Sequence, residues 1–142
     1  MLEKKLGVAL AALRATVFLV FFVWTIDKFV NPAHAAKVFE TFYKLPGLTE
    51  ALFIGIGGLQ LALIVGFLIG WQKKFTYGAV LVMHSISTLS SYAKYLAPYE
   101  GVNLLFFAAW PMLAACLALY LLRDYDTLFT IDQRKSLAFQ EA

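Results

Sequence analysis

The stretch YGAVLVMHSISTLSSYAKYLAP, residues 77–98, is long enough to cross a bilayer, yet a histidine and many hydroxyl groups crowd its middle. At about 100° per residue, one side of a helix collects its polar members, which are His84, Ser87, Thr88, Ser91, Lys94 and Tyr95. The opposite side keeps Val80, Leu81, Ile86 and Leu89. Burying a polar group without a partner costs roughly 2–7 kcal/mol. We therefore expect the polar stripe to face other helices or a wet cavity instead of lipid.

The composition of the whole chain is that of a membrane protein. Of its 142 residues, 61% are hydrophobic and 15% are charged, whereas about 25% of the residues of a soluble domain are charged. The net charge of +3 comes from basic residues at the ends of apolar runs, which argues against nucleic-acid binding. The single cysteine, Cys116, lies inside an apolar run and cannot form an internal disulfide. We expect one membrane domain that covers residues 1–142.

Four apolar runs have the length that a bilayer span requires, which is about 20 helical residues. They cover residues 7–30, 49–70, 75–96 and 102–122. After the first run, Asn31-Pro32 is a helix-start signal and predicts an amphipathic interfacial helix over residues 32–44. The predicted fold is an all-α integral membrane protein, a four-transmembrane-helix bundle with a short interfacial helix between helices 1 and 2. Residues 123–142 are predicted to form a cytoplasmic tail.

The distribution of lysine and arginine predicts the orientation. Eight of the 12 basic residues lie at one side of the predicted spans and four at the other. By the positive-inside rule, both termini and the loop at residues 71–76 are expected to be cytoplasmic. Two pairs of small residues predict close helix packing, Gly66 with Gly70 and Ala114 with Ala118. A protein partner or a second copy is expected there, and membrane lipid elsewhere. Pro111 is expected to kink the fourth span near its middle.

Polar and aromatic side chains inside the spans form the candidate site. A quinone or a similar small amphipathic ligand would suit a pocket made by His84, Gln60, Ser87, Thr88, Ser91, Trp24 and Trp110. For His84, the alternative is a packed residue that hydrogen-bonds between helices, for example to a carbonyl that Pro111 frees. The sequence contains no zinc-ligand spacing and no facing pair of histidines for haem, so neither a metal nor haem is expected.

Three charged residues lie within or at the boundary of the first span, and they are Arg14, Asp27 and Lys28. Arg14 lies about two turns inside the span, where its guanidinium either snorkels to the headgroups or meets an acceptor inside the bundle. Asp27 and Lys28 end the same span within reach of the interfacial helix. An ionisable residue inside a membrane is a functional hypothesis by default.

Several of these stretches resemble the DoxX-like family. They are Arg14 in the first helix, WTIDKF (24–29), FETFYKLPG (39–47) and GIGGLQLALIVGFLIG (55–70). The resemblance implies a small four-helix protein of the bacterial or archaeal inner membrane. Some members are associated with quinone-linked sulfur oxidation or with membrane redox complexes. Family members often carry glutamate where Gln60 stands here, and this chain has no cysteine arrangement for sulfur chemistry.

Two functions follow as hypotheses. The first is a membrane subunit of a redox system that binds a quinone, and any enzyme activity would then belong to a quinone-linked oxidoreductase. The second is a non-enzymatic scaffold, anchor or assembly subunit for a partner complex. Polar groups that converge on an open cavity would favour the first hypothesis, and mutual hydrogen bonds without a void would favour the second. The sequence assigns no catalytic residue.

Overall fold

The structure, a computed structural model, describes residues 1–132, and this part of the chain contains helices and no strand. In chain order the helices are α1 (Leu2–Val30), α2 (Pro32–Tyr43), α3 (Glu50–Leu68), α4 (Lys73–Ser90), α5 (Tyr92–Leu96), a 3₁₀ helix (Asn103–Ala108) and α6 (Ala109–Leu121). Three stretches are long and apolar enough to cross a membrane, namely α1, α3 and the continuous stretch Asn103–Leu121. The chain therefore fits a multi-pass membrane protein.

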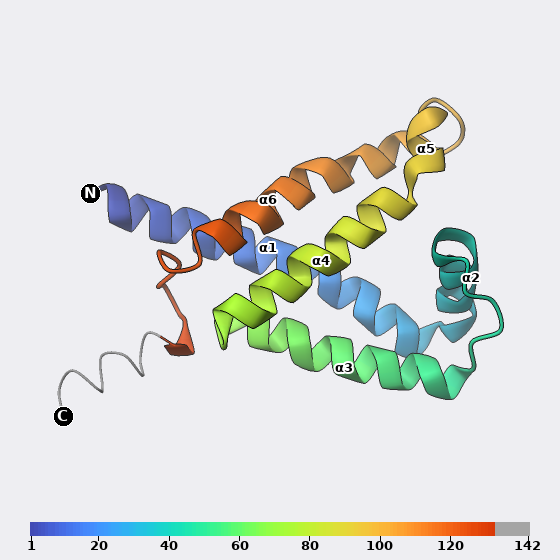
Figure 1. Cartoon of the computed structure of the whole chain (residues 1–142), viewed down its shortest axis with the longest axis horizontal. Coiled ribbons are helices and arrows are strands. Elements are labelled where there is room, and N and C mark those ends of the chain that lie inside the picture. Colours follow the sequence, from blue (N-terminus) through green and yellow to red (C-terminus); the bar gives the residue numbers. More distant parts are fainter. Residues whose placement is uncertain (133–142) are drawn as a thin grey trace.

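Helix α1 lies behind α4 in Figure 1 and packs against α2, α3 and α6. Its buried residues recur every three or four positions and are Gly7, Leu10, Arg14, Val17, Phe21, Thr25 and Lys28. Because a helix turns once in 3.6 residues, this spacing makes one continuous buried stripe. Leu10, Val17 and Phe21 supply the apolar core from this stripe, together with Ile64 and Phe67 of α3. Lys28 ends this stripe, and Arg14 lies within it, about two turns from Gly7.

Helix α4 is two-faced, as the sequence predicts. His84 and Thr88 are buried, whereas Ile86 and Leu89 are exposed. The sequence places Val80 on the outer side, but Val80 is fully buried. The buried face of α4 is therefore wider than the polar stripe by one row of side chains. The predicted span 75–96 is also interrupted. Helix α4 ends at Ser90, where the hydroxyls of Ser90 and Ser91 both donate to the Ser87 carbonyl and compete with the helical pattern.

The last apolar stretch is built from two helices. The 3₁₀ helix Asn103–Ala108 leads directly into α6, so Pro111 is the third residue of α6. The first backbone N–H groups of an α-helix have no partner inside it. Proline, which lacks the N–H, therefore fits the first turn of α6 without cost. The predicted mid-helix kink at Pro111 is replaced by a change of helix type just before it.

The two ends of the molecule differ. Helix α2 lies at one end, which we call the α2 end, and the N-terminus and the α3–α4 turn lie at the other, which we call the N-terminal end (Figure 1). The predicted helix start is present in α2, because the Asn31 side chain accepts a hydrogen bond from the His34 amide at 3.3 Å. After α6, residues 122–132 turn back across the N-terminal end, and we call them the closing segment. The rest of the predicted tail, residues 133–142, lies outside the described residues.

Candidate functional site

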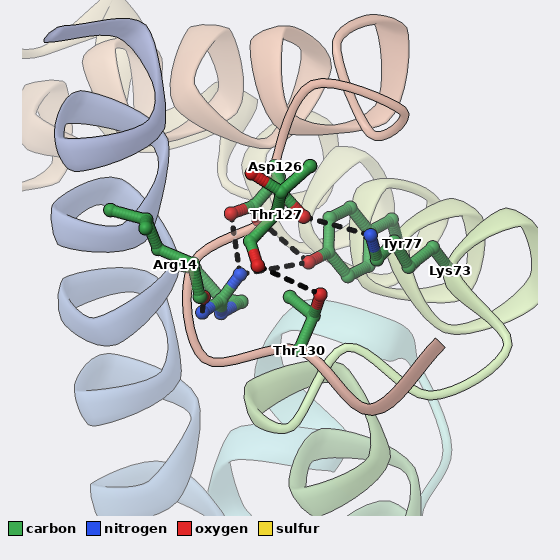
Figure 2. A network of polar contacts seen from close by, with 7 residues as sticks. Arg14, Lys73, Tyr77, Asp126, Thr127 and Thr130 are labelled. Atoms are coloured by element: carbon green, nitrogen blue, oxygen red, sulfur yellow. Dashed lines mark hydrogen bonds and ion pairs between the residues drawn. The ribbon is translucent and has the colours of Figure 1, made fainter. Parts of the chain in front are cut away.

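A buried ion pair occupies the N-terminal end of the bundle (Figure 2). Nη1 of Arg14 on α1 lies 2.5 Å from Oδ1 of Asp126 in the closing segment. Arg14 is 3% exposed and Asp126 is fully buried. The sequence leaves two alternatives for the Arg14 guanidinium, which are snorkelling to the headgroups and bonding to an acceptor inside the bundle. In the structure it bonds to an acceptor inside the bundle. Leaving a buried charge without its partner typically costs several kcal/mol, so these two residues constrain each other.

Two further side chains complete this network. The Tyr77 hydroxyl on α4 donates to Oδ2 of Asp126 at 2.7 Å, and Nη1 of Arg14 lies 3.4 Å from the same hydroxyl. Nζ of Lys73, at the start of α4, donates to the backbone carbonyl of Asp126 at 2.8 Å. Figure 2 shows these groups converging from α1, α4 and the closing segment. Within the described chain, Nε of Arg14 is buried and has no hydrogen-bond partner. The contacts of Asp126 with Arg14, Tyr77 and Lys73 join three separate parts of the chain, which are α1, α4 and the closing segment.

Backbone contacts hold the closing segment against the helices. Nη2 of Arg14 donates to the Leu128 carbonyl at 2.6 Å, and the Ile131 amide donates to the Ile69 carbonyl at 2.9 Å. Gly70 has a φ of +65°, and a methyl group added there would lie 2.5 Å from Thr130. Glycine is thus required at position 70 for both its conformation and its small size.

His84, the centre of the predicted ligand site, bonds to the protein itself. Its Nε2 lies 2.9 Å from the Ala109 carbonyl, two residues before Pro111, and its ring meets Phe21 of α1 edge-on at 6.2 Å between centroids. Since a carbonyl only accepts, Nε2 must carry the proton. In the neutral imidazole Nδ1 is then an acceptor, so it cannot donate to a quinone carbonyl.

Most hydroxyl groups that follow His84 bond to nearby carbonyls, whereas the half-buried Ser87 hydroxyl makes no hydrogen bond within residues 1–132. Thr88 donates to the His84 carbonyl at 2.8 Å and Ser91 to the Ser87 carbonyl at 3.0 Å. The Tyr95 hydroxyl turns back to the Thr88 carbonyl at 3.0 Å. The hydroxyl protons of Thr88, Ser91 and Tyr95 are therefore already used within the chain.

The other predicted pocket residues are not gathered around His84. Trp24 is 51% exposed and Trp110 is 45% exposed. Gln60 is half-buried on α3, and within residues 1–132 no hydrogen bond joins it to His84. Two surface hollows lie at the ends of the bundle, and His84 lines neither of them. Trp24 thus stands apart at His34, whereas Trp110 contacts Tyr95 of the polar stripe at 5.5 Å between ring centroids.

Asp27 and Lys28 meet helix α2, within the reach that the sequence predicts. Oδ2 of Asp27 lies 2.7 Å from Nδ1 of His34, and Trp24 stacks on the His34 ring at 6.2 Å. Nζ of Lys28 donates to the Trp24 carbonyl at 3.2 Å and lies 6.0 Å from the centre of the Phe39 ring. These contacts fasten α2 to the end of α1.

Some of the small residues pack against other parts of the chain, and others lie on an open helix face. Gly66 packs against Trp71 and Thr76, and Gly70 packs against Thr130, so the chain itself fills this predicted partner face. An open face remains on α3, where a methyl group added at Gly55 or Gly58 would meet nothing within 4 Å. The exposed small residues of this face are Ala51, Gly55, Gly58 and Ala62, which recur at intervals of four, three and four.

Comparisons of this chain with protein-family models, curated proteins and solved structures found no significant match. The DoxX-like resemblance therefore stays a prediction, and the geometry alone carries the functional argument. That geometry fits a multi-pass helical membrane protein, and it includes a buried Arg14–Asp126–Tyr77 network. Sequence reasoning missed Asp126. The signal available was that the carboxylates of the predicted spans, Asp27 and Glu50, stand at the end away from Arg14, which directs attention to the DYD stretch at 124–126.

Proposed function

We propose that this chain is a non-enzymatic membrane scaffold subunit that seats an apolar transmembrane helix of a partner protein. In this proposal four stretches cross the bilayer: α1, α3, α4 with α5, and Asn103–Leu121. Helix α4 is less apolar than the others, but its outward residues Val82, Ile86 and Leu89 are apolar and exposed. Its polar residues are turned inward, so its lipid-facing surface suits a span.

The observation that carries the proposal is the internal use of the polar side chains. The Nε2 proton of His84 is committed to Ala109, and Thr88 is committed to its own helix. A ligand in this region would have to replace bonds that already exist, and it would have to displace packed side chains. Interhelical hydrogen bonds, such as that of His84 to Ala109, stabilise membrane bundles. The scaffold hypothesis needs no further group in the interior.

The open face of α3 is the surface that we assign to the partner helix. Small residues at helix–helix contacts let two backbones approach closely in lipid, where packing holds helices together. Gly55 and Gly58 leave the α3 backbone open along this face. Leu59, which is 77% exposed, stands beside it and offers a large apolar side chain to the same partner. The DoxX-like resemblance makes a membrane redox complex the first partner to examine.

The test is native mass spectrometry of the protein after gentle extraction, with wild type, Gly58→Leu and Ala15→Leu compared. Ala15 is a small exposed residue on α1 and serves as the control. We expect a stoichiometric partner protein with wild type and Ala15→Leu and its loss with Gly58→Leu. A monomer or a homodimer in all three samples would overturn the proposal. A co-purifying quinone that disappears with His84→Phe would establish the redox hypothesis in its place.

A further inference from the structure

A hollow of about 580 Å³ opens at the N-terminal end of the bundle, outside the buried ion pair. It is lined by the start of α4 and by the closing segment. Its charged members are Lys73, Lys74, Arg123, Asp124 and Asp132. Apart from the carbonyl contact of Lys73, the Arg14–Asp126 network does not use these side chains. The hollow is therefore a separate feature of the molecule.

The depth of this hollow is that of a membrane interface. Helix α3 ends at Leu68, α6 ends at Leu121 and α4 begins at Lys73, so the apolar helices all stop beside it. Exposed aromatic residues adjoin the lining residues in sequence, namely Trp71, Phe75 and Tyr125. Aromatic and basic side chains gather where the hydrocarbon core meets the headgroups. A group that enters this hollow from the bilayer would be a headgroup.

The basic side chains around the hollow form no ion pair within the described residues. Within residues 1–132, Lys73, Lys74 and Arg123 have no carboxylate oxygen within 4.0 Å. Lys73 donates to the neutral Asp126 carbonyl, and Nη1 of Arg123 donates to the Tyr120 carbonyl at 2.8 Å. One of the two carboxylates, Asp132, accepts from the Lys73 amide at 3.4 Å. This carboxylate already stands at the positive end of α4, where the Gln72 side chain makes no cap, so Lys74 and Arg123 are the cations left for an external anion.

We propose that this hollow binds the phosphodiester headgroup of an anionic glycerophospholipid, with Lys74 and Arg123 as the principal contacts of the phosphate. Asp124 on the same lining accepts from hydroxyl groups of the headgroup. The inference is independent of the scaffold role, because it involves the opposite end of α3 from the proposed partner face. Basic hollows beside transmembrane helices are a recurring mode of headgroup recognition.

The test is a titration of the detergent-solubilised full chain with phosphatidylglycerol, followed by thermal unfolding and by native mass spectrometry of bound lipid. Lys74→Gln with Arg123→Gln removes two charges at the hollow. Lys37→Gln with Lys44→Gln removes two charges at the α2 end and is the matched control. Each charge near a surface changes affinity for anionic lipid by about fivefold. We expect the first pair to need roughly 25-fold more lipid for the same effect, and the control pair to bind as wild type does.

Three results would overturn the proposal. One is an equal loss of lipid binding in the control pair, and another is an equal response of the wild type to phosphatidylcholine. The third is saturation of the site by millimolar inorganic phosphate, because it would assign the hollow to a free anion instead of a lipid. The comparison of the two lipids uses the wild type alone. It therefore decides the matter even where the charge variants fold poorly.

Discussion

Nη1 of Arg14 lies 2.5 Å from Oδ1 of Asp126, although the two residues stand near opposite ends of the described chain. Both are buried, and Tyr77 of a third element bonds to the same carboxylate. The pair connects the first helix to the closing segment that follows the last helix. The stability of the whole bundle should therefore depend on side chains outside the apolar spans.

Replacement of Asp126 by asparagine should destabilise the fold by about 3–5 kcal/mol, because it leaves the buried guanidinium of Arg14 without a counter-charge. Unfolding in mixed micelles by a denaturing detergent measures the change. Asp124→Asn is the matched control, since Asp124 is exposed, and it should change stability by less than about 0.5 kcal/mol. Equal stabilities of the two variants would contradict the importance of the ion pair.

Replacement of Tyr77 by phenylalanine should cost about 1.5–3 kcal/mol, the range for a hydrogen bond to a charged group. The ring and its contact with Phe67 are kept, so the change isolates the hydroxyl that donates to Asp126. The same unfolding assay measures it, with Tyr99→Phe as the control because Tyr99 is 90% exposed. In an Asp126→Asn background the cost of Tyr77→Phe should shrink, and full additivity would show that the two groups act separately.

Alanine at position 70 should be poorly tolerated for two separate reasons. Gly47 provides the comparison, because its φ of +75° is also left-handed but its surroundings are open. Gly47→Ala should cost only the backbone strain, about 1–2 kcal/mol. Gly70→Ala adds a clash with Thr130, and overpacking adds about 1–3 kcal/mol. If the two variants unfold at the same detergent concentration, the closing segment does not pack on Gly70 in solution.

Replacement of His84 by phenylalanine should lower the free energy of unfolding by about 0.5–1.5 kcal/mol, the usual worth of one neutral hydrogen bond. The aromatic contact with Phe21 is kept, so the change removes chiefly the bond to Ala109. Ser85→Ala is the control, since that hydroxyl bonds only within its own helix. Any stabilisation by an added quinone analogue should be the same in wild type and His84→Phe. A response found in the wild type alone would support the ligand hypothesis.

Local patterns predict the helices of this protein well. The residues 32–44 predicted for the interfacial helix contain α2, and the inward direction of His84 and Thr88 follows from helical spacing alone. Spacing does not show that the predicted third span is divided, with α4 ending at Ser90 and α5 beginning at Tyr92. Nor does it show that Pro111 falls in the first turn of a new helix.

The buried network was harder to predict because its members are distant in sequence. A stretch such as RDYDTLFTID (residues 123–132) is polar by composition, so hydropathy alone indicates a solvated tail. Only the three-dimensional return of this stretch buries Asp126 against Arg14. The closing segment also places Thr130 against Gly70. The spacing of Gly70 with Gly66 predicts a partner helix at this position. Pairwise spacing shows that a surface packs closely, but it does not show which chain supplies the other side.

The position of Asp126 late in the sequence also has a consequence for the synthesis and membrane insertion of the chain. A chain is synthesised at about 5–20 residues per second, so Arg14 precedes its counter-charge by roughly ten seconds. During that interval we expect the nascent first helix to sit shallow in the bilayer, with its guanidinium drawn to the headgroups. The helix would then settle to its final depth only after residue 126 leaves the ribosome.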